Sequence, residues 1–339
     1  MNFISLILAI GSALLALVLY IPFINLLYRL KIRDPNPKTH RDVFGKATSV
    51  FQKLRASKTG IPIGAGFLVV VVTIALFTAG KFIFGYETKG FLAIISVFAT
   101  FMLIGLIDDI RKTFNIKGRA LQLRVREKFI LQLFASFVIS YFLAREGIIK
   151  LSLPGVFEIT NIYLVTLFSG LGMTFMLNAF NITDGSDGLA GGILLFALIP
   201  IWLISKIQGN IEIEHFSALW FGGMIAFLYF NVHPARLFMG DAGSLAFGAT
   251  LTLLLMMLNV SYIIPVLGLL YIVEASSSLF QWIYRRITGK KFFDSAPLHY
   301  HFENRGWPET KVVFRFWLYQ VFLSIVSLAL VFLATFPIK

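Results

Sequence analysis

The sequence has no cysteine, which excludes a disulfide framework, a thiolate nucleophile and a zinc–thiolate site. Charge is also scarce, because 14% of the 339 residues are charged, against roughly a quarter in ordinary soluble domains. What the sequence has instead is apolar, since 58% of the residues are hydrophobic and the mean hydropathy is +0.82. Long apolar runs recur from end to end, which predicts an all-α polytopic membrane protein.

The apolar runs predict about ten transmembrane helices in a single integral membrane domain over residues 1–339, since a span needs about 20 apolar residues. The expected spans are 3–29, 60–80, 90–107, 128–145, 161–181, 187–206, 216–231, 242–259, 262–284 and 312–336. The first has no basic n-region and no small-residue cleavage site, so we expect it to be retained. The short, alternating stretch Lys150–Asn161 contains Pro and Gly and predicts a small hairpin outside the bilayer.

The basic residues predict the orientation of these spans. Of the 30 Lys and Arg residues, 24 lie in or beside the loops that follow the odd-numbered spans. Lys and Arg are retained on the cytoplasmic side, so we expect both termini outside. The Lys and Arg residues behind the net charge of +13 therefore form a ring at the cytoplasmic membrane surface, which we call the cytoplasmic collar. Such a collar suits anionic lipid or an anionic substrate, and nucleic acid is not an expected partner. Within this collar, residues 45–60 form either a basic amphipathic surface helix or a disordered loop.

Five aspartates are expected at one depth, at the inner membrane interface. Asp108 and Asp109 end the third span, Asp184 and Asp187 lie between the fifth and sixth, and Asp241 opens the eighth. Carboxylates gathered at one level repel each other, so a cation must compensate them. Lysine or arginine side chains are one candidate, and a hard divalent ion held by oxygen ligands is the other. Mg²⁺ takes one or two carboxylates together with substrate phosphates, which favours a site for a diphosphate.

The spacing around these acids adds detail to that site. Asn181, Asp184 and Asp187 are three residues apart and share one face if a helix begins at or before Asp184. Asn231 ends the span that precedes Asp241. Asp241 is expected at a helix start, where free N–H groups and the helix dipole favour an anion such as phosphate.

The last cytoplasmic loop, residues 295–317, holds His299, His301 and Glu303. In an extended chain alternate residues face one way, so both histidines are expected to point together. A hydrogen bond to a phosphate or sugar is favoured over a metal site, and plain surface histidines are the alternative. Glu274 is an acid within the ninth span, either functional or bonded to the nearby serines or to a neighbouring helix.

These motifs resemble those of the polyprenyl-phosphate N-acetylhexosamine-1-phosphate transferases, and most closely those of the muramoyl-pentapeptide branch. The matching stretches are "LIDDIRK", "NAFNITDGSDGLAGG", "FMGDAGSLAFG", "VEASSSLFQW" and "APLHYHFENRGWPETKVVFRFW". The resemblance implies transfer of phospho-N-acetylmuramoyl-pentapeptide from UDP-N-acetylmuramoyl-pentapeptide to undecaprenyl phosphate, which forms lipid I and releases UMP. It also implies Mg²⁺ dependence, an active site that faces the cytoplasm in the bacterial cytoplasmic membrane, and often a homodimer.

The resemblance assigns roles to the matching residues. It implies that three acids are catalytic and hold the metal: Asp108, Asp109 and, foremost, Asp241. It places four residues around the diphosphate: Asn181, Asp184, Asp187 and Asn231. Phe238 would stack on uracil, Lys128 would meet a phosphate, and His299, as a catalytic residue, and His301 would complete the site.

Four departures from the family pattern concern the donor rather than the phosphoryl site. Tyr300 replaces the middle of three consecutive histidines, and Gly60–Gly66 lacks two hydroxyl side chains. The chain is longer than the family norm between His40 and Lys58, and Ser186 stands where Leu is usual. A sister enzyme that transfers N-acetylglucosamine-1-phosphate is therefore one alternative. An ion-coupled transporter is another, although transporters place their acids at the midplane within inverted repeats. For the reaction itself, direct attack by the acceptor phosphate is favoured over an aspartyl-phosphate intermediate.

Overall fold

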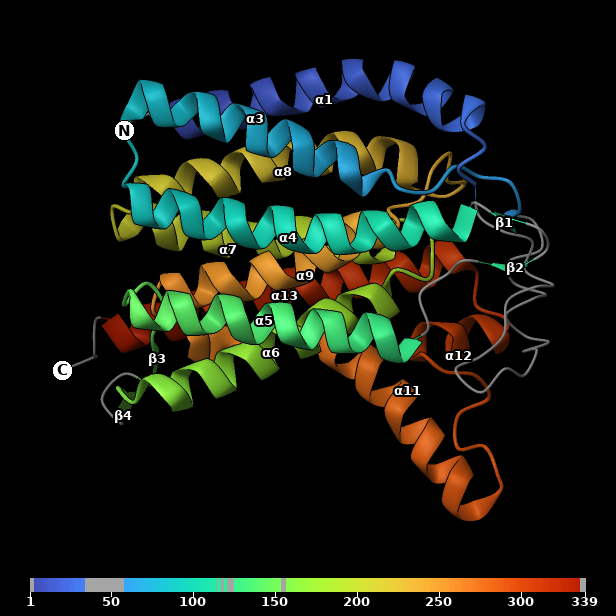
Figure 1. Cartoon of the computed structure of the whole chain (residues 1–339). Coiled ribbons are helices and arrows are strands. Elements are labelled where there is room, and N and C mark those ends of the chain that lie inside the picture. The colour runs from blue at the N-terminus through green and yellow to red at the C-terminus, as the bar shows by residue number, and fades with distance from the viewer. Residues whose placement is uncertain are drawn as a thin grey trace.

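The computed structural model describes residues 3–33, 58–113, 115–116, 119–120, 125–153 and 157–335. Residues 45–57 of the predicted basic segment lie outside this part of the chain. The described residues are mostly helical, and the long helices run side by side in one bundle (Figure 1).

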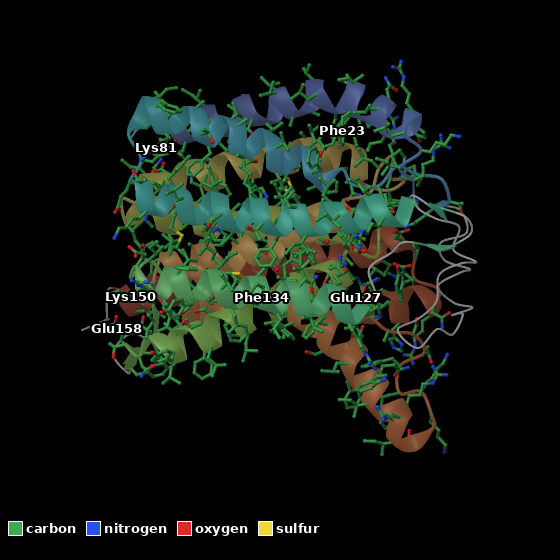
Figure 2. The ribbon with its side chains drawn as sticks, in the orientation of Figure 1. Phe23, Lys81, Glu127, Phe134, Lys150 and Glu158 are labelled. Atoms are coloured by element: carbon green, nitrogen blue, oxygen red, sulfur yellow. The ribbon has the colours of Figure 1, made fainter. Side chains whose placement is uncertain are left out.

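Eight of the described helices are long and apolar enough to cross a membrane. They are α1 (Ile4–Arg29), α3 (Gly66–Phe84), α4 (Thr88–Thr113), α5 (Val125–Arg145), α6 (Ile162–Thr183), α7 (Leu189–Ile207), α8 (Ile211–Asn231) and α13 (Glu309–Thr335). Each corresponds to a span expected from the sequence, which confirms the all-α polytopic class. Their outward surface is apolar, as at Phe134 of α5, whose side chain is 66% exposed (Figure 2).

Local signals set the ends of several helices. The side chain of Asn161 accepts hydrogen bonds from the amides of Tyr163 and Leu164 and so caps α6. Asn210 caps α8 in the same way. At the other end, α3 stops at Gly85, whose positive φ of 66° is a conformation that glycine adopts without strain.

Two predicted spans differ from straight membrane-crossing helices. Helix α9 (Asp241–Met257) has 17 residues, and every residue from Asp241 to Met256 is buried among neighbouring helices. The ninth span was expected as one run over 262–284. Instead, the segment of η3 (Ser261–Ile263) and α10 (Ile264–Leu267) meets α11 (Leu269–Thr288) at an angle of 67°. Helix α11 therefore leaves the bundle at a slant (Figure 1).

The two ends of the bundle carry different structures (Figure 1). Helix α1 begins and helix α13 ends at the end that bears the antiparallel hairpin of β3 (Leu151–Leu153) and β4 (Phe157–Ile159), which confirms the hairpin predicted within Lys150–Asn161. The opposite end carries a second hairpin, β1 (Asn115–Ile116) with β2 (Arg119–Ala120), and the short helix α12 (Leu298–Asn304). The extended chain on which the shared direction of His299 and His301 depended is not found, because both residues lie in α12.

An aromatic cluster joins three helices in the core. Phe98 of α4 packs against Phe216 and Trp220 of α8, with ring centroids 5.3 Å apart in both pairs. Phe247 of α9 lies 5.4 Å from Trp220. Such pairs contribute about 0.5–1.5 kcal/mol beyond their buried area. The cluster therefore fixes α4 against α9, whose facing ends carry the aspartates of the site.

Candidate active site

The start of α9 is held by a carboxylate from α4. Asp109 accepts hydrogen bonds from the backbone amides of Asp241 and Ala242, both at 3.0 Å. Gly240 before them has φ 76°, and a Cβ there would lie 2.6 Å from Asp109 Oδ2. Because Asp109 is 2% exposed and bonds two free N–H groups of the first turn, it acts as a cap for α9.

A lysine and an asparagine connect two acids next to this cap. Lys128 of α5 forms an ion pair with Asp241 and lies 3.2 Å from Asp108 Oδ2. The amide of Asn181 donates to Asp241 Oδ1 and to Ser244 Oγ, both at 2.8 Å. We call Asp108, Lys128, Asn181 and Asp241 the Asp241 cluster. Four helices, α4, α5, α6 and α9, thus bring together residues that lie up to 133 positions apart.

The Asp241 cluster has the chemistry of a hard-cation site. Asp108 and Asp241 are 1% and 6% exposed, and they offer the carboxylate oxygens that Mg²⁺ takes, one or two at a time. Asp109 fits less well, because both of its oxygens already accept from backbone amides. The positive charge that the structure supplies here is Lys128, which was the alternative compensation expected from the sequence.

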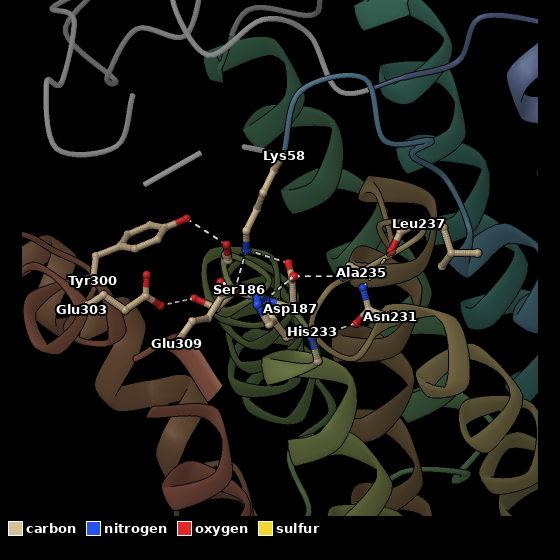
Figure 3. A network of polar contacts seen from close by, with 12 residues as sticks. Lys58, Ser186, Asp187, Asn231, His233, Ala235, Leu237, Tyr300, Glu303 and Glu309 are labelled. Atoms are coloured by element: carbon tan, nitrogen blue, oxygen red, sulfur yellow. Dashed lines mark hydrogen bonds and ion pairs between the residues drawn. The ribbon is translucent and has the colours of Figure 1, made fainter. Parts of the chain in front are cut away.

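A second group of charged side chains surrounds Asp187 (Figure 3). Lys58 Nζ lies 2.6 Å from Asp187 Oδ1 and 2.5 Å from Glu309 Oε1. On the other side, His233 Nδ1 lies 3.1 Å from Asp187 Oδ2 and 3.5 Å from Glu309 Oε2. We call Lys58, Asp187, His233 and Glu309 the Asp187 cluster. Its His and two acids could together hold a metal ion, but Lys58 already forms ion pairs with both carboxylates.

Asp184 and Asp187 do not share a helix face. Helix α6 ends at Thr183 and α7 begins at Leu189, so both aspartates lie in the turn between them. The condition for a shared face, a helix that begins by Asp184, is therefore not met. Asp187 is buried in its cluster, whereas Asp184 caps the end of α6 and is partly exposed.

Asn231 is the last residue of α8, and Phe238 lies on the loop that connects α8 to α9. Asn231 accepts from the amide of Gly188 at 3.1 Å and donates to the carbonyl of Leu237 at 2.9 Å, so it ties this loop to the start of α7. Phe238 is partly buried, and its amide donates to the carbonyl of Pro62 at 2.8 Å. The backbone that carries Phe238 is thereby fixed against the segment before α3.

His299 and His301 have different partners, contrary to the prediction that they point together. A helix turns about 100° per residue, so side chains two positions apart diverge. His299 Nδ1 lies 2.8 Å from Glu274 Oε2, and both side chains are fully buried. His301 Nδ1 accepts instead from the amide of Asp294 at 3.2 Å. The sequence offered two structural partners for Glu274, the nearby serines or a neighbouring helix. The Glu274 carboxylate contacts the neighbouring helix, α12, while Ser277 bonds only the backbone carbonyl of Glu274.

Several residues at this end were not singled out by sequence reasoning. Lys58 and His233 belong to the Asp187 cluster, and Glu309 was quoted only as part of a family motif. Two further hydrogen bonds attach α12 to the turn before α7: Ser186 Oγ donates to Glu303 Oε1 at 2.6 Å, and Tyr300 Oη donates to the carbonyl of Gly185 at 2.9 Å. Ser186 and Tyr300 are both positions where the sequence departs from the family pattern. These two departures together could have indicated a contact between α12 and the turn before α7.

The long apolar helices define a membrane-embedded protein, and residues 91–259 match the model of Glycosyl transferase family 4. Full-length relatives narrow this class. The chain is 35% identical to the phospho-N-acetylmuramoyl-pentapeptide-transferase of Caldicellulosiruptor bescii over 94% of this chain and 93% of the relative. It is 33% identical to the Clostridioides difficile protein of the same name, over 96% and 97% of the two chains. The chain belongs to the phospho-N-acetylmuramoyl-pentapeptide transferase family, which confirms the resemblance.

Proposed function

We propose that this protein transfers phospho-N-acetylmuramoyl-pentapeptide from its UDP carrier to undecaprenyl phosphate, which yields lipid I and UMP. The observation that carries the proposal is the Asp241 cluster at the start of α9, in a chain that belongs to this transferase family. An oxygen of the acceptor phosphate forms a bond to the sugar-linked phosphorus of the donor. The bond from that phosphorus to the oxygen of UMP breaks, and UMP leaves with the electron pair.

The chemical difficulty is that an anion must attack a diphosphate, so the site must position the two and reduce their repulsion. Lys128 supplies a positive charge next to Asp241. Asp109 accepts from two N–H groups in the first turn of α9 and so fixes the position of Asp241. Mg²⁺, when bound by Asp108 and Asp241, supplies further neutralisation of phosphate charge. A phosphate monoester is mostly ionised at pH 7, so orientation by the aspartates is required more than strong base catalysis.

The remaining donor contacts are proposed from the resemblance to the family. Asn181, Asp184, Asp187 and Asn231 line the same end of the bundle and are proposed to surround the donor diphosphate. Phe238 is proposed to stack on uracil. Of the two histidines of α12, His299 is proposed to be a catalytic residue, and His301 is proposed to contact the sugar or a phosphate.

The proposed topology has ten spans, both termini outside the bacterial cytoplasmic membrane and the active site facing the cytoplasm. Two observations support it. The start of α1, the end of α13 and the β3–β4 hairpin lie at one end of the bundle, and the loops rich in Lys and Arg follow the helices that end at the other (Figure 1). The interface location suits the acceptor, whose phosphate stays at the membrane surface while its apolar tail remains in the bilayer. A homodimer is part of the same proposal.

The direct test is to incubate the purified protein with undecaprenyl phosphate, Mg²⁺ and UDP-N-acetylmuramoyl-pentapeptide and to measure UMP release and the lipid-linked product. UDP-N-acetylglucosamine is tested in parallel. Product from that donor alone would replace the proposal by the sister activity.

Asp241→Asn tests the Asp241 cluster, which is the observation on which the proposal rests. We expect it to lower Mg²⁺-dependent UMP release by roughly 100-fold or more, because one charged ligand at the reacting phosphates is lost while shape is kept. Glu158→Gln, which neutralises an exposed acid of the distant hairpin, should retain wild-type turnover. Equal thermal unfolding temperatures would show that both variants fold. Wild-type turnover in Asp241→Asn would contradict the role given to the cluster.

A further inference from the structure

Glu274 is a buried acid of α11 whose carboxylate contacts a single residue of α12 in two ways. Its Oε2 lies 2.8 Å from His299 Nδ1, and its Oε1 accepts from the backbone amide of His299 at 3.1 Å. Both side chains are 0% exposed. The nearby Ser277 donates to the backbone carbonyl of Glu274, at 2.7 Å, and not to the carboxylate. The carboxylate is thus directed at His299 from both of its oxygens.

This contact determines how the imidazole is oriented. A carboxylate accepts hydrogen bonds, so Nδ1 must be the protonated, donating nitrogen of His299. The ring is held at two points, its Nδ1 and its own backbone amide, which leaves little freedom to rotate. The nitrogen that remains for chemistry is Nε2.

Nε2 of His299 is directed at the turn that precedes α7. A Cβ added at Gly185 would overlap Nε2, so the ring edge lies directly against the backbone of this turn. Among the described residues, Nε2 is buried and has no hydrogen-bond partner. A buried polar atom without a partner is costly, at about 1–3 kcal/mol, and is retained where it has a use. The same turn contains Asp184 and Asp187, next to both clusters of the site.

We propose that Glu274 is a positioning residue, which fixes His299 so that Nε2 accepts a hydrogen bond from a sugar hydroxyl of the sugar-diphosphate donor when the donor occupies the turn. This inference rests on the proposed function for the identity of the ligand. The precedent in physical terms is a carboxylate that orients a histidine through Nδ1 so that the opposite nitrogen can act. Glu274 itself touches neither substrate nor reacting atoms.

The competing explanation is that the pair only attaches α12 to α11. The two explanations differ in a double-mutant cycle of kcat/KM with Glu274→Gln, His299→Gln and the double variant. If Glu274 acts through His299, we expect each single variant to lose about 10- to 100-fold and the double variant to be no slower than His299→Gln alone. Losses that multiply would overturn the proposal, because they would mean that Glu274 acts independently of His299.

Gln320→Met is the matched control. Gln320 is also fully buried, and its side chain donates to the carbonyl of Leu267, at 3.1 Å, on the segment before α11. Its loss should lower the thermal unfolding temperature without changing kcat/KM by more than about twofold. If Glu274→Gln does not fold, Glu274→Asp, which keeps the charge but shortens the side chain, enters the same cycle.

A second readout does not depend on activity. In protein labelled with ¹⁵N-histidine, the side-chain signal missing from His299→Gln identifies His299 among the five histidines. We expect wild type to show Nδ1 as the protonated, hydrogen-bonded nitrogen, and Glu274→Gln to shift or broaden this signal while Gln320→Met leaves it unchanged. An unshifted signal in Glu274→Gln would overturn the positioning role. If wild type forms no lipid-linked product, the proposed function fails, and this signal alone then decides on Glu274.

Discussion

At the scale of single residues, the Asp241 cluster depends on a close approach between α4 and the start of α9. Gly105 of α4 faces the backbone of Asp241, and a Cβ at this position would overlap the carbonyl of Asp241 and the amide of Ala242. One turn further on, Asp108 and Asp109 reach the same helix start. A missing side chain is thus as necessary to the site as the carboxylates.

We predict that Gly105→Ala separates α4 from α9. Overpacking costs about 1–3 kcal/mol, and a displacement of about 1 Å at reacting groups costs roughly 100-fold in rate. The variant should therefore show a lower unfolding temperature and at least a 10-fold loss of turnover. Gly90→Ala in the same helix is the control, because the nearest atom to its Cβ would be 3.8 Å away. Equal behaviour of the two variants would refute this account.

The sequence predicted which residue types would form the site better than it predicted their partners. Asp108, Lys128, Asn181 and Asp241 were singled out, and the structure brings them together. The pairing of Lys58 with Asp187 could not be predicted, since 129 positions separate them and no local pattern links them. Contacts of this kind are set by the packing of helices and not by spacing along the chain.

At the scale of elements, α12 is the clearest difference from expectation. It has seven residues, begins after Pro297 and ends before Gly306, and its His, Tyr and Phe residues are weak helix formers. A segment this short is helical because of its contacts: Tyr300 and Glu303 bond the turn before α7, and Glu274 accepts from the first turn. Tertiary contacts of this kind override local propensity.

The attachment of α12 should depend on pH through Glu303. Burial raises the pKa of Glu303, while the hydrogen bond from Ser186 and the charge of Lys58 act in the opposite direction. A raised pKa means that the folded state holds the proton more tightly than the unfolded state. This contribution to stability is complete below the ordinary value of 4.5 and is lost as pH rises through the raised pKa.

Glu303→Gln tests this sign. The unfolding temperature of wild type minus that of Glu303→Gln should fall as pH rises from about 4 to about 8. Ser186→Ala removes a contribution that lowers the pKa of Glu303, so it should move this fall to higher pH. A difference that stays constant with pH would show that Glu303 has the same proton affinity in both states. Differential scanning fluorimetry in detergent provides the measurement.

At the scale of the whole molecule, hydropathy predicted most of the architecture, because a sum over about 20 residues is insensitive to local exceptions. The same sum could not predict the bend before α11, which depends on how α10 packs against α13 and on the break at Gly268. Hydropathy also could not distinguish α9, which is covered by protein, from α1 or α5, whose outward side chains are exposed.

The proposed orientation can be tested by labelling single introduced cysteines, since the chain has no cysteine of its own that would first have to be replaced. Glu158→Cys in the β3–β4 hairpin should react with a membrane-impermeant maleimide on intact cells. Arg305→Cys, exposed just after α12, should react only once the membrane is opened. Wild type controls for background labelling, and the reverse pattern would place the active site outside.

The sheltered position of α9 has a consequence for how the protein responds to its surroundings. Lipid tails meet helices such as α1 and α5, whose outer faces are apolar and exposed, but not the helix that begins at Asp241. A change in bilayer thickness is therefore absorbed by tilting at the perimeter. The depth of Asp241 in the bilayer is then set by its protein neighbours, so the proposed site keeps one geometry in membranes of differing acyl composition.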